Sequence, residues 1–151
     1  MTRSLVLPLL LALGGLALAA EPHGHETVHD SPSADGAHAT GDLRTIMLSL
    51  GEEMAHAQAA LWREDLATVA RAGRTVADHP HVSPSEMARV QATLGADFGA
   101  FVAADRDTHD AAVTLAEAAG GGDLSATVQA LGAVQAGCVG CHQQFRARLV
   151  E

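Results

Sequence analysis

The chain has 151 residues and a formal net charge of −9 at neutral pH, with eighteen acidic against nine basic side chains. This length is enough for one domain with a hydrophobic core of ordinary size. The acidic excess argues against nucleic acid or an anionic membrane as a partner, and it favours docking to a basic surface on another protein.

The first twenty residues, 1–20, have the pattern of a secretory signal peptide. Arg3 gives a positive start, and an apolar run extends from Leu5 to Leu18. Small residues in an A-x-A-like arrangement follow, so we expect cleavage near Ala19 or Ala20. A membrane span needs ~20 apolar residues, so this run is too short for a comfortable anchor. The sequence therefore predicts an exported, periplasmic protein that is soluble rather than embedded in a membrane.

Residues 21–41 lack apolar periodicity and are rich in small and polar residues, so we predict a disordered leader. Four histidines lie in it: His23, His25, His29 and His38. Imidazole binds copper, nickel and zinc, so loose metal binding is an alternative to a flexible polar tether.

From residue 42 to residue 151 the pattern is helical. The first helix is expected to start after Asp42, which can act as its N-cap. Its inward stripe follows the i, i+3, i+4, i+7 rule with Leu43, Ile46, Met47, Leu50, Met54 and Leu61. A second helix is predicted from about Glu64 to Asp78, because His79 precedes a proline and is steered away from helical geometry.

Helix signals continue to the C-terminus. Ser83-Pro84-Ser85-Glu86 has the form of a capping box with proline at the first helical position. The stretch after it is expected to divide at Gly95 and Gly99 and to stop at Gly120-Gly121-Gly122. Asp123 can cap the last helix, whose inward face is expected to hold Leu124, Val128, Leu131, Val134, Cys138, Cys141, His142, Phe145 and Leu149. No β-alternation competes, so the pattern predicts an all-α fold, an antiparallel four-helix bundle.

The segment Cys138-Val139-Gly140-Cys141-His142 has the spacing of c-type haem attachment. On a helix the two thiols and the imidazole project from one face, where two thioether bonds and an iron ligand can form together. A disulfide here would close a very small loop, a thioredoxin-like pair would follow a strand, and a zinc site would need further ligands. The spacing therefore predicts one haem c attached through Cys138 and Cys141 and ligated by His142. Such a planar cofactor would also add apolar bulk to a core with only three Phe and one Trp.

A haem-attachment segment on the last helix of an alanine-rich bundle, followed by Phe145 and Arg146, resembles the class II c-type cytochromes, the cytochrome c′ group. The resemblance covers about residues 42–149. It implies that a side chain of the first helix covers the opposite haem face. That side chain is apolar in five-coordinate gas-binding members and a methionine ligand in six-coordinate electron carriers. Met47, with Gly51 and Met54 following at +4 and +7, is similar to the six-coordinate pattern, so the resemblance implies Met47 as the second axial ligand.

Two alternatives stay open for the first helix. Met47 and Met54 are also compatible with simple core filling, and a shift of one residue would place Leu48 over the iron, as in a protein that binds NO or CO. With Met47 and His142 as ligands no coordination position is free. The chain is then predicted to carry one electron by Fe(III)/Fe(II) cycling and not to be an enzyme. The resemblance is also compatible with a homodimer, although no motif specifies one.

Other titratable side chains are expected to have ordinary structural roles. Asp105 and His109, four residues apart, are expected to form a structural pair or to touch a haem propionate. Arg146 is expected near a propionate or in solvent at the helix end. His79 and His81 are expected to be loop residues.

Overall fold

The structure, a computed structural model, describes residues 40–150. The predicted signal peptide and the four histidines of the predicted leader lie outside the described residues. The last two residues of that predicted leader, Thr40 and Gly41, are described and form a short strand.

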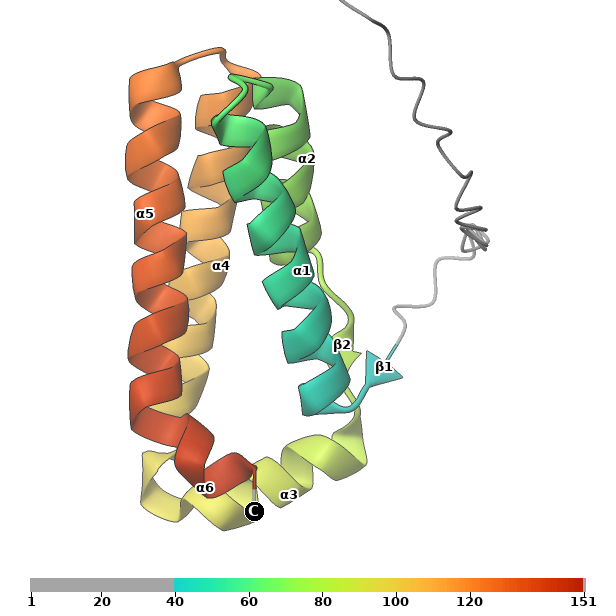
Figure 1. The fold of residues 1–151 in the computed structure, drawn as a ribbon. Coiled ribbons are helices and arrows are strands. Elements are labelled where there is room, and N and C mark those ends of the chain that lie inside the picture. Colours follow the sequence, from blue (N-terminus) through green and yellow to red (C-terminus); the bar gives the residue numbers. More distant parts are fainter. Residues whose placement is uncertain (1–39, 151) are drawn as a thin grey trace, which may run out of the picture. The chain divides into compact units, whose positions relative to one another are not determined.

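Four long helices run alternately up and down and form the bundle (Figure 1), as predicted. They are α1 (Leu43–Leu61), α2 (Leu66–Ala77), α4 (Phe98–Gly120) and α5 (Leu124–Cys141). Each packs mainly on its neighbour in the sequence, α1 on α2, α2 on α4 and α4 on α5. The fold is therefore an all-α antiparallel four-helix bundle.

Shorter elements close one end of the bundle, where α1 begins and α5 ends (Figure 1). They comprise α3 (Pro84–Leu94), the 3-10 turn η1 (Gly95–Asp97), the π-helical turn η2 (His142–Arg146) and α6 (Ala147–Leu149). Arg148 links the two sides of this end, because it donates hydrogen bonds to Asp97 Oδ2 (2.7 Å) and to the carbonyl oxygen of Leu94 (2.8 Å).

Three of the four predicted helix starts are confirmed by side-chain caps, whereas the second helix begins at Leu66, after the N-cap Asp65, rather than near Glu64. The Asp42 carboxylate accepts from the Thr45 N–H at 2.9 Å, and the Asp123 carboxylate accepts from the Ala126 N–H at 2.9 Å. Ser83 Oγ likewise accepts from the N–H of Glu86, at 3.3 Å. These contacts satisfy backbone donors that would otherwise have no partner in the first helical turn.

The predicted capping box at Ser83 is only half formed. Its second half would be a bond from the Ser83 N–H to the carboxylate of Glu86, but that N–H donates to the carbonyl oxygen of Gly41 at 3.0 Å. The strand β1 (Thr40–Gly41) pairs in parallel with β2 (His81–Val82), and this pairing brings Gly41 alongside. The Glu86 carboxylate pairs instead with Arg89, at 2.8 and 2.9 Å. The sequence pattern predicted no strands, and β1 and β2 contradict this. Each strand has only two residues, too few to show an alternating pattern beside the helical periodicity around them.

Only one of the two glycines expected to divide the third helical stretch does so. Gly95 has a φ of +56°, in the left-handed region, and ends α3. Gly99 stays inside α4, which then runs unbroken to Gly120. The difference arises because a left-handed residue breaks the hydrogen-bond ladder, whereas a glycine with helical backbone angles only weakens it.

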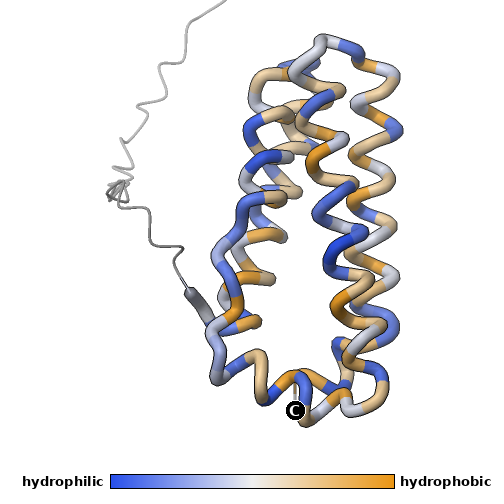
Figure 2. The backbone as a smooth tube through the Cα atoms, turned by 180° about the vertical axis from the view of Figure 1, so that it is seen from behind, coloured by the Kyte–Doolittle hydropathy of each residue, from blue (hydrophilic) through white to orange (hydrophobic). Residues whose placement is uncertain are grey.

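The buried side chains form two clusters, one above the other along the bundle. The larger cluster lies among α1, α2, α4 and α5 and includes Val69, Leu115, Leu131 and Val134. The smaller cluster lies at the end closed by α3 and consists of Leu43, Val90, Leu94, Phe101 and Phe145. Figure 2 shows how apolar and polar residues alternate along the helices that provide these clusters.

By length and composition, one helical stretch of residues 40–150 could cross a membrane, Leu124–Leu149, of which 22% of the most apolar window is buried. Its inner residues Leu131, Val134 and Phe145 belong to the two core clusters. A core helix of a soluble bundle can pass the same test of length and composition.

Candidate functional site

Cys138 and Cys141 lie one turn apart on α5, at the level where the two core clusters meet. Both are free thiols of intermediate burial. Cys138 packs against the larger cluster and Cys141 against the smaller one. The pair therefore faces the boundary between the two apolar clusters from a rigid helix, which suits a flat apolar group that must touch both.

The surroundings of the two thiols keep them protonated at neutral pH. Burial raises the pKa of Cys138. Burial also raises the pKa of Cys141, and the nearby Asp105 carboxylate raises it further. A catalytic redox pair needs a lowered thiol pKa, and the residues before Cys138 form a helix rather than a strand. The thioredoxin-like alternative is therefore disfavoured.

The sequence pattern predicted that His142 lies on the buried face of α5. In the structure His142 is exposed. Leu124 and Val128 are also more exposed than expected, at 39% and 51%. Successive residues are rotated by about 100° around the helix axis. The buried side of α5 is therefore centred near Cys138 and Phe145, whereas His142 is rotated about 40° from Cys138, in the direction away from Phe145. His142 is thus at the edge of the buried arc rather than within it.

The edge of α5 on which His142 lies faces α1. A groove of about 490 Å³ between the two helices is lined on the α5 side by Leu124, Val128 and Gln135. Gln135 also donates a hydrogen bond from Nε2 to Oε1 of Gln58 on α1, at 3.1 Å. His142 follows Leu124 by eighteen residues, which is five full turns, so it continues the same line along α5.

On α1, the Met47 side chain points into the core and the Leu48 side chain points to solvent. Met47 is partly buried against the smaller cluster, the one that Cys141 also contacts. Leu50 and Met54 pack against the larger cluster, as Cys138 does. Leu48 is 62% exposed. Within α1, therefore, Met47 and not Leu48 lies on the side of the core that the cysteines share.

The donor set fits the group that the sequence predicts. Two free thiols in i and i+3 positions lie at the boundary of two apolar clusters, an exposed imidazole follows on the α1 side, and a thioether lies inward on α1. Thiols, imidazole and thioether are the side chains that hold a c-type haem.

An all-α bundle with a Cys-x-x-Cys-His segment on its last helix defines the class, the helical-bundle c-type cytochromes. The chain matches the family model described as Cytochrome C′ over residues 37–146, well over half of its length, and it belongs to this family. No curated protein and no solved structure gives a match. Family membership implies a covalently bound haem c. Members are haem proteins that carry electrons or bind gases, are typically periplasmic, and are generally not enzymes.

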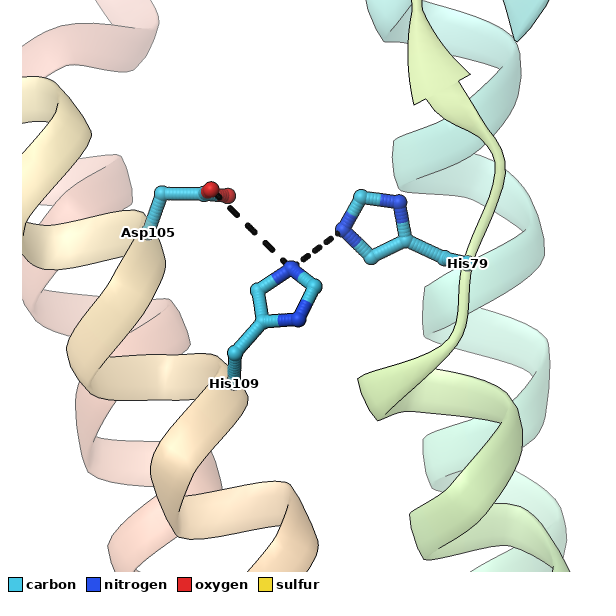
Figure 3. Close-up of side chains that lie close together, drawn as sticks. All are labelled: His79, Asp105 and His109. Atoms are coloured by element: carbon cyan, nitrogen blue, oxygen red, sulfur yellow. Dashed lines mark hydrogen bonds and ion pairs between the residues drawn. The ribbon is translucent and has the colours of Figure 1, made fainter. Parts of the chain in front are cut away.

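The structure also joins side chains that the sequence kept apart. Asp105 and His109 come close as expected, with 3.9 Å between Oδ2 and Nε2. The closer partner of His109, however, is His79, whose Nε2 lies 2.8 Å from His109 Nε2 (Figure 3). His79 was expected to be a simple loop residue, and no local spacing could reveal a contact between residues thirty positions apart. Arg146 is exposed.

Proposed function

We propose that this protein carries single electrons by means of one haem c, bound through thioether bonds to Cys138 and Cys141 and ligated by His142 and Met47. When bound, the haem supplies an Fe(III)/Fe(II) couple. The observation that carries the proposal is the place of Cys138 and Cys141 on α5. They lie where two apolar clusters meet, next to the side of α5 that faces α1.

The inward position of Met47 supports six-coordinate iron over an open coordination site. Met47 is partly buried on the cluster that Cys141 contacts, whereas Leu48, the residue of the gas-binding alternative, is 62% exposed. A Met/His ligand pair raises the reduction potential, because thioether sulfur favours ferrous iron. Both ligands sit on helices of one bundle, which keeps them in place when the iron changes its charge.

The first experiment is the optical and EPR spectrum of the purified haem protein at neutral pH, with and without CO. We expect a low-spin haem in the oxidised wild type and no CO adduct after reduction, because CO binds ferrous iron. Met47→Leu should give a high-spin haem that binds CO. Met54→Leu is the matched control, because Met54 is also a partly buried methionine of α1 but packs on the larger cluster. A high-spin wild-type haem that takes up CO would overturn Met47 as a ligand and make NO or CO binding the function.

Covalent attachment is tested separately by acid–acetone extraction followed by haem staining of denaturing gels. The wild type should keep its haem, and a Cys138→Ala, Cys141→Ala variant should release it. Haem that is extracted from the wild type would refute thioether attachment without bearing on the iron ligands.

We further propose that the partner is a redox protein with a basic docking surface and that the encounter takes place in the periplasm. The formal net charge of −9 supports such a partner, since charge complementarity raises association rates. Electron transfer to a basic partner should therefore slow as ionic strength rises. A rate that is insensitive to salt would refute electrostatic docking. N-terminal sequencing of the exported protein should find cleavage near Ala19 or Ala20.

A further inference from the structure

A second group of potential ligands, none of them assigned to the haem, lies between α4 and the segment that joins α2 to β2. Asp105 and His109 project from successive turns of α4, and His79 reaches them from the joining segment (Figure 3). Their ligand atoms all lie within 4.8 Å of one another. Among residues 40–150, this is the one place where three His, Cys, Asp or Glu side chains lie close enough together to hold a metal ion.

The hydrogen bonds around His79 prepare its Nε2 as a ligand. Nδ1 of His79 lies 2.8 Å from the carbonyl oxygen of Pro80. A carbonyl can only accept, so Nδ1 carries the proton and Nε2 of the neutral ring has a free lone pair. Metal-binding histidines characteristically donate their other ring N–H in this way.

The lone pair of His79 is directed at His109. Its Nε2 is 2.8 Å from Nε2 of His109, which must therefore be the donor in the metal-free pair. A metal ion between the two nitrogens would take the place of this shared proton, while the His109 proton moves to Nδ1. The pair is thus arranged so that a change of tautomer at His109, with no proton lost, lets a metal ion replace one hydrogen bond with two metal bonds.

The distances allow this exchange with small movements. Zinc binds imidazole nitrogen at about 2.05 Å, so tetrahedral geometry needs about 3.3 Å between two nitrogen ligands. The His79 and His109 Nε2 atoms would separate by about 0.5 Å, and Asp105 Oδ2, now 3.9 Å from His109 Nε2, would approach that atom by a similar amount. The third pair, His79 and Asp105, lies within 4.8 Å and would close by up to about 1.5 Å. The side chains of His109 and Asp105 are 31% and 47% exposed, and His79 lines an open groove of about 690 Å³. The ligands can therefore adjust, and a cation can reach them from solvent.

We propose that His79, Asp105 and His109 bind a divalent transition-metal ion of the zinc class, with water completing the coordination. Two imidazoles and one carboxylate are ligands that zinc and its neighbours prefer. Because His79 comes from the segment after α2 and the other two ligands come from α4, the ion joins that segment to the bundle. Its ligands are not among the residues assigned to the haem, and they differ from the four histidines of residues 21–41.

The test is calorimetric titration of zinc into the purified haem-containing full chain, in which thioether bonds occupy the cysteines. His79→Gln and His109→Gln should each remove one zinc site per chain or weaken it at least about tenfold. The matched control is His56→Gln, because His56 is an exposed histidine near a carboxylate, 3.9 Å from Glu53. Residues 21–41 are unchanged in every variant, so any zinc bound by their histidines is common to all the titrations.

Thermal unfolding with and without zinc is a second readout. Zinc should raise the Tm of the wild type and of His56→Gln, and it should raise the Tm of the site variants less. Asp105→Asn alters the most exposed ligand, so it tests the site even where a histidine variant folds poorly. Unchanged stoichiometry and affinity in His79→Gln and His109→Gln would overturn the proposal and leave the two histidines as a hydrogen-bonded pair only. Loss of one zinc site when His79→Gln is added to a Cys138→Ala, Cys141→Ala variant would support it whether or not haem attachment is upheld.

Discussion

Replacement of Gly73 by alanine tests how closely α2 packs on α4. Gly73 is buried, and a Cβ at this position would lie 3.0 Å from the backbone nitrogen of Ala116 and 3.1 Å from the carbonyl oxygen of Ala112. Both atoms belong to the backbone of α4, so they cannot rotate away as a flexible side chain would. The methyl group can be accommodated only by moving the two helices apart.

Two opposing effects set the size of the change. Alanine favours a helix over glycine by about 1 kcal/mol, and overpacking of a close contact costs about 1–3 kcal/mol. Gly132 on α5 is the matched control, because a Cβ there meets no atom within 4 Å. The helix-propensity gain is common to both variants. The difference between the two variants therefore reports the packing effect alone. The free energy of unfolding of Gly73→Ala should be about 1–3 kcal/mol lower than that of Gly132→Ala.

Urea unfolding of the two variants, followed by far-UV circular dichroism, measures this difference. In thermal unfolding it should appear as a Tm lower by about 4 °C per kcal/mol for a domain of this size. If Gly73→Ala proves as stable as Gly132→Ala, the inference that α2 and α4 approach through this glycine is refuted.

Two further predictions concern the helix ends. The Asp42 carboxylate accepts hydrogen bonds from the side chain and the backbone N–H of Thr45, at 2.7 and 2.9 Å, and these bonds lower its pKa in the folded state. Its contribution is therefore present above the unfolded pKa and lost as the pH falls through the lowered folded value. Asp42→Ala should reduce the free energy of unfolding at neutral pH and match the wild type in strong acid, and a difference that persists in strong acid would contradict this. Arg148→Gln should speed amide hydrogen exchange in α6 and at the end of α3, because it removes the bonds to Asp97 and Leu94. Arg89→Gln, which breaks an ion pair within α3, should leave exchange in α6 unchanged.

Much of the fold follows from local patterns in the sequence. Asp42, Ser83 and Asp123 cap the helices that were predicted to begin after them. A cap is satisfied by a backbone N–H three residues away, so residue type and spacing contain all the information that it needs. The periodicity of apolar residues similarly predicted four long helices, and the Cys138–His142 segment pointed to the family.

Contacts between distant elements depended on the tertiary structure. The exposure of His142 follows from how α5 is rotated against α4, which places the buried arc on Cys138 and Phe145. A rotation of about 40° is too small for a stripe of apolar residues to resolve. The pairing of β1 with β2, which takes the Ser83 N–H, depends on the path of the segment after α2.

The same path decides the His79–His109 contact. Asp105 and His109 are neighbours on any helix, so the sequence predicted their approach. His79 joins them only because the segment after α2 places its ring opposite His109 of α4 (Figure 3). The path of such a segment is fixed by packing rather than by residue spacing. The sequence by itself thus determined the helices, their starts and the haem-attachment spacing. The tertiary structure alone decided which side chains of different elements meet, because that depends on helix rotation and loop path.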